Sequence, residues 1–309
     1  MAKLVERLSK IPVINKLVSW SKKITFPKME GLTLYDIMEL YIIGIIKGAF
    51  SNRAAAIAFS FFMAIFPFLL FLLNLIPYMP LDNFQQDFFD FLSENVPPTT
   101  YDAIYGIIND ILNNSNKGLL SSGGIIAVFL VANGINSMLG GFENSYHVTI
   151  TRSFIRQYLV AMFLGICFSF ILLITVALIV VSEVFIQTFE YRYLDSVTVM
   201  VWLRYIFMAL MILLCVSLIF KLGSKQLKKT PFISVGSVFT TILIIISSYG
   251  FGIYVLRFAK YNELYGSIGT ILVLMMYIWL NCMISLLGFE LNATINRLKS
   301  EKNITFNKN

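Results

Sequence analysis

Five stretches of this 309-residue chain are long and apolar enough to cross a lipid bilayer as α-helices. An α-helix rises about 1.5 Å per residue and the hydrocarbon core is about 30 Å thick, so a spanning helix needs roughly 20 apolar residues. The chain is 58% hydrophobic and 13% charged, with a mean hydropathy of +0.78, which predicts an integral membrane protein. The five stretches are residues 54–77, 159–182, 197–220, 232–256 and 264–289, and a shorter sixth covers residues 123–140.

Lysine and arginine are distributed unevenly around these six stretches. If all six span, residues 1–53, 141–158, 221–231 and 290–309 hold 19 of the 24 basic residues, and the alternate segments hold 4. Because cytoplasmic flanks collect basic residues, both termini are predicted to lie in the cytoplasm, with the protein in the plasma (inner) membrane. The sixth stretch is counted because omitting it would put the later basic loops on the wrong side. The net charge of +7 then requires no nucleic-acid partner.

The predicted fold is therefore all-α, a polytopic membrane bundle of six transmembrane helices over residues 54–293. Residues 1–53 are basic and carry apolar residues at helical spacing, which predicts interfacial N-terminal helices. Residues 80–122 hold six carboxylates against one lysine, with two apolar helical patterns, which predicts an extracytoplasmic helical hairpin that is either a static cap or an acidic gate. Residues 294–309 form a basic cytoplasmic tail.

Three predicted spans carry small or polar residues along one helix face. Proline breaks the hydrogen-bond ladder of a helix, and in lipid the freed carbonyl must find a partner, so Pro67 favours an inward-facing first span. Polar helix faces also avoid lipid. We interpret these faces as the lining of a substrate path, or alternatively as interhelical hydrogen bonding without a substrate. The residues are Ala56, Ser60, Ala64 and Pro67 on the first span, Asn133, Ser137, Gly140 and Asn144 on the second, and Asn281, Ser285, Gly288 and Asn292 on the sixth.

Charged residues at the ends of the spans suggest a network. Arg53 begins the first span and Glu290 ends the sixth, so the predicted topology puts opposite charges at the same depth. Pairing lowers the cost of burying either one, and we predict that they pair; the alternative for Arg53 is a simple positive-inside anchor. Arg204 lies in the outer third of its span, where it either snorkels to the head groups or faces Glu183 or Asp195.

The pattern of an enzyme site is missing from the sequence. There is one histidine, His147, interpreted as an ordinary loop residue in preference to a pH sensor, and there is no glycine-rich phosphate loop. The three cysteines lie within spans and are interpreted as apolar packing residues. We predict no enzyme activity, no cofactor and no metal. The expected partners are membrane lipids and a lipid or small-solute substrate, and the sequence does not indicate the oligomeric state.

Three segments resemble the YihY/BrkB family of six-span integral membrane proteins. They are NRAAAIAFSFFMAIFPFLL at 52–70, ENSYHV with TRSFIRQYL within 143–159, and YGSIGTILVLMMYIWLNCMISLLGFELNA at 265–293. The resemblance covers roughly residues 35–295 and implies a membrane protein of a family often presumed to be transporters, with no agreed substrate. An older label of the family, ribonuclease BN, implies a zinc nuclease, which would need several histidine and carboxylate ligands where this chain has one histidine.

Two functions remain open at this point. The first is a transporter or translocator of a lipid or small solute through a cavity lined by the first, second and sixth spans. The alternative is a non-transporting membrane scaffold that binds an envelope partner through its outer acidic hairpin. Transport predicts a cavity among the path residues, whereas a scaffold predicts a dry core there.

Overall fold

The computed structural model describes residues 21, 25–26, 32–75, 84–95, 105–106, 108–109, 117–148, 152–189, 194–225, 230–258 and 267–306. Regular structure in these ranges is helical apart from one two-residue antiparallel pairing, in which β1 (Thr25–Phe26) faces β2 (Leu32–Thr33). The predicted all-α class is confirmed. Of the interfacial helices expected within residues 1–53, any part in residues 1–20 lies outside the described residues.

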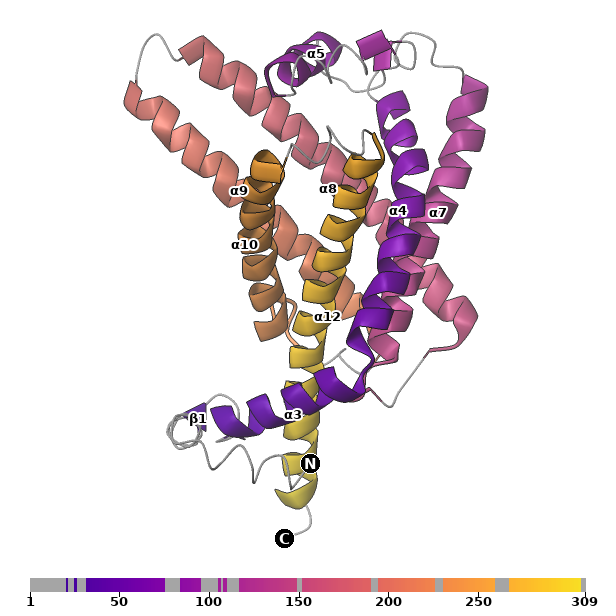
Figure 1. Cartoon of the computed structure of the whole chain (residues 1–309), viewed down its shortest axis with the longest axis vertical. Helices are drawn as coiled ribbons and strands as arrows, with labels where there is room; N and C mark the ends of the chain where they lie inside the picture. The colour runs from indigo at the N-terminus through magenta and orange to yellow at the C-terminus, as the bar shows by residue number, and fades with distance from the viewer. Residues whose placement is uncertain are drawn as a thin grey trace.

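Six long helices form the bundle over the described residues (Figure 1), and each coincides with one of the six predicted stretches. Apolar windows long enough to cross a membrane lie in α8, α9, α10 and α12, and the bent pair of α3 (Leu34–Lys47) and α4 counts as a fifth. By length and apolarity the described residues thus hold four or five helices able to cross a membrane, and the count of six is consistent with them. The bounds are α4 (Phe50–Leu75), α7 (Lys117–Glu143), α8 (Phe154–Phe189), α9 (Leu194–Gly223), α10 (Val235–Phe258) and α12 (Ser267–Phe306).

The packed core of the bundle lies where α4, α7, α9 and α12 meet. The rings of Phe142 and Phe289 stack with centroids 4.1 Å apart, and the Phe220 ring meets Phe142 edge-on at 5.6 Å. Ile57 and Leu286 are fully buried beside them. Elsewhere large apolar side chains are exposed along α8, α9 and α10, as expected of helices that face lipid.

Helix α3 lies across one end of the bundle, where it crosses the lower part of α12 in Figure 1, and we call this the α3 end. It meets α4 at 66° through a turn at Gly48 and Ala49, and Ala49 has a φ of 44°. One face of α3 packs against α12, where Ile37 meets Ile295 and Leu298. The opposite face exposes Met38, Ile42 and Ile46, so apolar side chains lie on both faces of α3.

The opposite end of the bundle carries α5 (Phe84–Asn95), which packs against α8 (Figure 1). The Phe89 ring lies 5.0 Å from the Tyr105 ring, which joins α5 to the segment that follows it. Helix α5 occupies the first arm of the predicted hairpin, and most of the second arm lies outside the described residues.

Candidate functional site

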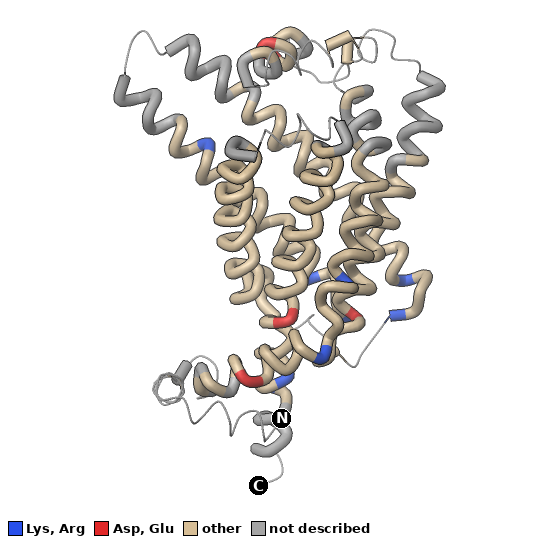
Figure 2. Tube along the Cα trace, in the orientation of Figure 1, with Lys and Arg blue, Asp and Glu red and all other residues tan. Residues whose placement is uncertain are grey.

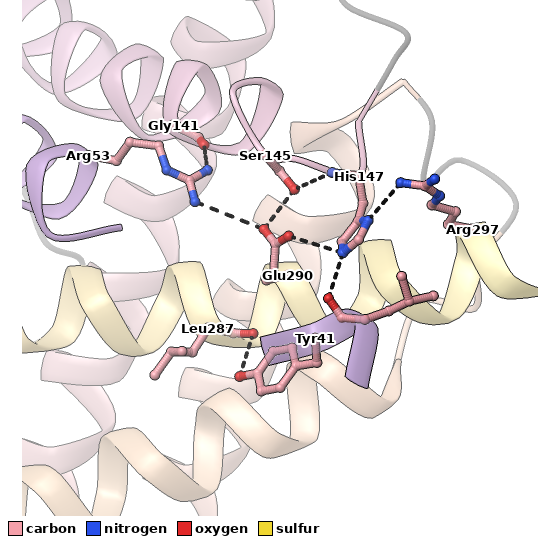
Figure 3. Close-up of polar contacts among 9 residues, drawn as sticks. Tyr41, Arg53, Gly141, Ser145, His147, Leu287, Glu290 and Arg297 are labelled. Carbon is pink, nitrogen blue, oxygen red and sulfur yellow. Dashed lines mark hydrogen bonds and ion pairs between the residues drawn. The ribbon is translucent and has the colours of Figure 1, made fainter. Parts of the chain in front are cut away.

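At the α3 end, Arg53 of α4 and Glu290 of α12 lie together in the interior (Figure 3). The Glu290 side chain is 1% exposed and the Arg53 side chain 9%. Arg53 Nη2 lies 4.0 Å from Glu290 Oε2, and Arg53 Nη1 donates to the carbonyl oxygen of Gly141 at 2.8 Å. The ion pair that the sequence predicts is therefore present, although 4.0 Å is too long for a direct hydrogen bond.

The loop after α7 adds two polar side chains to this pair. Ser145 donates its hydroxyl hydrogen to Glu290 Oε2 at 2.7 Å. His147 is 1% exposed, with Nε2 3.0 Å from the carbonyl oxygen of Leu40 and 3.7 Å from Glu290 Oε1. Its Nδ1 lies 3.2 Å from Arg297 Nη1. Because a guanidinium only donates and a carbonyl only accepts, these partners define a neutral imidazole with its hydrogen on Nε2.

Helix α3 covers this group of residues directly. A Cβ at Gly44 would overlap Glu290 Oε1 and lie 2.9 Å from His147 Nε2, so the close approach requires glycine. One turn earlier, Tyr41 donates its hydroxyl hydrogen to the carbonyl oxygen of Leu287 at 3.2 Å. We call Arg53, Ser145, His147, Glu290 and Arg297 the Glu290 cluster.

Three atoms of the Glu290 cluster lack a hydrogen-bond partner in the described structure. They are Glu290 Oε1 and Arg53 Nε and Nη2. Buried polar atoms in folded proteins are nearly always hydrogen-bonded, and those that are not mark strained or functional positions. Arg53 and Glu290 thus each keep a buried polar atom without a hydrogen-bonded protein partner among the described residues.

A second polar contact anchors the loop that carries His147. The backbone N–H of Arg152 donates to both carboxylate oxygens of Glu143, at 3.1 and 3.3 Å, and its guanidinium donates to the carbonyl oxygen of Leu222 at 2.6 Å. Burial lowers the pKa of Arg152, and the charge of Glu143 opposes that shift. Because Leu222 lies at the C-terminal end of α9, the cation also meets the negative end of that helix. The loop is thus fastened to both α7 and α9.

The path residues predicted on the first two spans occupy different environments. The hydroxyls of Ser60 and Ser137 lie 2.8 Å apart and join α4 to α7. Ala56, Asn133 and Asn144 are exposed. Helix α4 continues through Pro67, whose side chain lies outside the described residues, and Gly140 of α7 lies near the Gln157 amide.

The path residues predicted on α12 make their hydrogen bonds within α12 itself and to the start of α10. Asn281 donates to the carbonyl oxygen of Tyr277 at 2.9 Å, and Ser285 donates to that of Asn281 at 2.8 Å. Asn292 accepts the N–H of Gly236 at 2.8 Å and donates to Ser234 Oγ at 2.7 Å. A Cβ at Gly288 would overlap Thr240 Oγ1, so the two helices approach closely there. The contacts of Asn292 and Gly288 therefore join α12 to α10.

A partly open cavity of about 480 Å³ lies between α4, α7, α8, α9 and α10. Its volume is in the range of small-molecule sites. The hydroxyl of Thr175 donates to the carbonyl oxygen of Ile171 at 2.7 Å, which leaves the cavity lining apolar. Of the path residues whose side chains the structure describes, Ala64 alone lines it. Other lining residues include Phe61, Ile135, Phe168, Leu172, Met208, Met211 and Cys215.

Arg204, for which snorkelling and a pair with Glu183 or Asp195 were the two interpretations, does not join the Glu290 cluster. Arg204 lies on α9 with its guanidinium 5.8 Å from the Tyr205 ring. Arg204 lies 19 positions before Gly223, which is about 28 Å along α9. Gly223 packs against Phe142 at the α3 end, so Arg204 lies far from the Glu290 cluster. The side chain of Glu183 lies outside the described residues. Figure 2 shows several charged residues gathered at the α3 end.

Sequence reasoning did not find the roles of Ser145, His147 and Arg297 in the Glu290 cluster. A loop histidine and a basic tail residue carry no signal of burial. Gly44 does carry one, because a glycine inside an apolar helix often marks a close approach. Among the described residues, no group of three or more His, Cys, Asp or Glu side chains could hold a metal ion.

A bundle of several long apolar helices with a buried charge cluster at one end defines a polytopic helical membrane protein. The chain matches the family described as Virulence factor BrkB over residues 45–308, and it belongs to that family. The family expected from the sequence motifs is confirmed.

Relatives of the chain carry two kinds of name. It is 33% identical over 251 residues to the ribonuclease-like protein YfkH of Bacillus subtilis, covering 80% of this chain and 90% of YfkH. It is 24% identical to a UPF0761 membrane protein of Stenotrophomonas maltophilia, covering 79% of this chain and 57% of that protein. A UPF0761 membrane protein of Aggregatibacter aphrophilus is 22% identical, over 82% of this chain and 90% of that protein. No solved structure matches the chain.

Proposed function

We propose that this membrane protein is a lipid translocator, and that an acyl chain of its substrate occupies the apolar cavity. The observation that supports this function is the cavity itself, which is partly open and has an apolar lining. Apolar cavities exclude water and bind apolar molecules. In a bilayer the acyl chain is the apolar group that such a cavity meets most often.

The geometry favours a lipid over a polar solute. A polar solute would need polar groups directed into its path, because desolvating it without partners is costly. Three of the polar residues expected to line a path instead join helices to one another: Ser60 and Ser137 between α4 and α7, and Asn292 toward Gly236 of α10. The cavity residues Phe168 and Met211 fall inside apolar windows of α8 and α9 that are long enough to span a membrane.

Native mass spectrometry of protein extracted gently from its own membrane tests lipid binding. We expect the wild-type protein to retain a lipid mass and Ala64→Phe, which fills the cavity, to lose it. Ala56→Phe is the matched control, since Ala56 is an exposed alanine two turns earlier on α4 and should leave retention unchanged. A lipid-free wild-type protein would favour the scaffold alternative. Equal retention in Ala64→Phe would place the lipid elsewhere.

Exchange of a fluorescent phospholipid between leaflets of proteoliposomes tests translocation. The wild-type protein should accelerate exchange over protein-free vesicles, Ala64→Phe should abolish that acceleration, and Ala56→Phe should preserve it. Lipid retention without accelerated exchange would contradict translocation and leave lipid binding alone.

A further inference from the structure

We propose that Arg204 binds the phosphate group of the phospholipid whose acyl chain occupies the apolar cavity. This inference rests on the proposed function and deepens it, because it names the head-group chemistry of the lipid and a residue that contacts it. The Glu290 cluster, at the other end of the bundle, takes no part in it.

The apolar cavity opens between α8 and α9. Among the described residues that line it, only Leu172 of α8 and Met208 of α9 are exposed, each at 37%. A side chain that lines a cavity and is also exposed lies at its opening, and we call these two residues the mouth. Toward the α3 end the cavity is closed, because its lining residues Ile135 and Val216 are buried. An acyl chain therefore reaches the cavity from the bilayer between α8 and α9.

Arg204 lies on the face of α9 that lines the cavity, just beyond the mouth. It precedes Met208 by four positions, about 6 Å along the helix, and Met211 by seven, and these spacings put the three side chains on one helix face. Its neighbours Leu203 and Tyr205 are each more than half exposed, whereas Arg204 is half-buried. The guanidinium thus lies at the rim of the mouth.

The depth of Arg204 matches the phosphates of one leaflet. It lies about 28 Å along α9 from Gly223 at the α3 end, and the hydrocarbon core is about 30 Å thick. Trp202 and Tyr205 beside it are exposed, and such aromatic side chains gather at the level of the head groups. Phosphates of the leaflet opposite the α3 end therefore meet Arg204. The acyl chain of the same molecule passes Met208, one turn deeper.

A guanidinium is suited to a phosphate. Its planar fork of donors binds phosphate oxygens in pairs, and its positive charge strengthens each hydrogen bond. The Arg204 guanidinium also lies 5.8 Å from the Tyr205 ring, whose face attracts a cation. A phosphate site predicts that the protein distinguishes lipids by their head groups. An arginine that only snorkels, or only pairs with Glu183, predicts no such preference.

Native mass spectrometry with lipids of defined head group tests the site. Delipidated protein in detergent is mixed with phosphatidic acid or with diacylglycerol, which has the same acyl chains without the phosphate. We expect the wild-type protein to retain phosphatidic acid about tenfold more than diacylglycerol. Arg204→Gln should retain the two lipids equally, and Arg204→Lys should keep part of the preference.

Arg156→Gln is the matched control. It removes an exposed arginine from the first turn of α8, near the α3 end and away from the mouth, so the wild-type preference should persist. Glycerol 3-phosphate, which has the phosphate but no acyl chain, should not be retained. The proposal is overturned by equal retention of the two lipids in the wild-type protein, by an unchanged preference in Arg204→Gln, or by retention of glycerol 3-phosphate to the level of phosphatidic acid.

Ala64→Phe distinguishes failure of this site from failure of the proposed function. Because it fills the cavity, it should lose both lipids. If it does so while Arg204→Gln keeps the preference, the cavity binds the acyl chain and the phosphate site is refuted. If Ala64→Phe retains both lipids, the proposed function fails first and this inference fails with it.

Chemical modification of arginine tests the site without a variant that could fail to fold. Phenylglyoxal reacts with accessible guanidinium groups, and mass spectrometry of the peptides measures the modified fraction. Phosphatidic acid should reduce modification of Arg204 several-fold relative to diacylglycerol, and modification of the exposed Arg156 should be the same with either lipid. Equal modification of Arg204 with the two lipids would refute the phosphate site.

Discussion

Ser145 donates its hydroxyl hydrogen to Glu290 Oε2 at 2.7 Å, across 145 positions of the sequence. The bond ties the loop after α7 to α12 and orients the carboxylate with its second oxygen toward α3. Arg53 approaches the same oxygen from α4 at 4.0 Å. Three segments distant in sequence thus meet at one buried carboxylate, and several expected outcomes follow from that arrangement.

Arg53→Ala should destabilise the protein by about 3–5 kcal/mol, because it leaves Glu290 buried without its cation. Adding E290Q removes the orphaned charge, so the double variant should be more stable than Arg53→Ala alone. The free energy of unfolding in detergent, measured for both single variants and the double variant, gives the coupling. Strictly additive effects would show that the two side chains do not interact.

Gly44→Ala should loosen α3 from α12. The new methyl group overlaps Glu290 Oε1, and overpacking of this kind costs about 1–3 kcal/mol. Gly250→Ala on α10 is the control, since a Cβ there meets nothing within 4 Å and alanine favours a helix. Thermal unfolding should show a lower midpoint for Gly44→Ala only. A midpoint at or above that of the wild-type protein would contradict the close packing of α3.

Ala49→Gly should stabilise the protein slightly. Ala49 has a φ of 44°, a conformation that costs a residue with a Cβ about 1–2 kcal/mol. Glycine removes this cost but loses more entropy on folding, by about 0.5–1 kcal/mol. The net gain in thermal stability should therefore be small and positive. A clear loss would mean that the methyl group of Ala49 makes a contact worth more than the strain.

Asn292→Ala should separate α10 from α12. The variant leaves the buried N–H of Gly236 without an acceptor, which costs about 1–3 kcal/mol. Asn144→Ala is the matched control, because Asn144 is exposed in the turn after α7. Unfolding in a denaturing detergent should give a lower free energy of unfolding for Asn292→Ala than for Asn144→Ala. Equal stability of the two variants would argue against the contact between α10 and α12.

Much of the fold follows from the sequence because membrane spans are set by length and apolarity. The six apolar stretches each coincide with a helix, with ends that move by at most about two helical turns except for α12, which continues to Phe306. Arg53 and Glu290 were expected together because the topology alone places them at one depth. Helix length and charge are properties that a single sequence carries.

The cavity could not be predicted for a physical reason. Phe168 lines it, whereas Phe170, two positions later on α8, is 62% exposed on the outside of the bundle. Both are phenylalanines in an apolar helix, and only tertiary packing decides which one faces the interior.

The burial of His147 also arises from tertiary packing. By sequence it is one polar residue in a short loop. Helix α3 folds back at the turn of Gly48 and Ala49 and supplies the carbonyl of Leu40 above it, while Arg297 approaches from α12. None of these contacts is local in sequence.

The central claim is that an acyl chain enters the cavity, and photocrosslinking tests it most directly. A phospholipid with a photoreactive group in its acyl chain is reconstituted with the protein, and the labelled peptides are identified by mass spectrometry. The account predicts labelling at Met208, Met211 and Phe168, lost in Ala64→Phe and kept in Ala56→Phe. Labelling confined to outward-facing residues such as Ile242 and Ile246, and unchanged by Ala64→Phe, would contradict it.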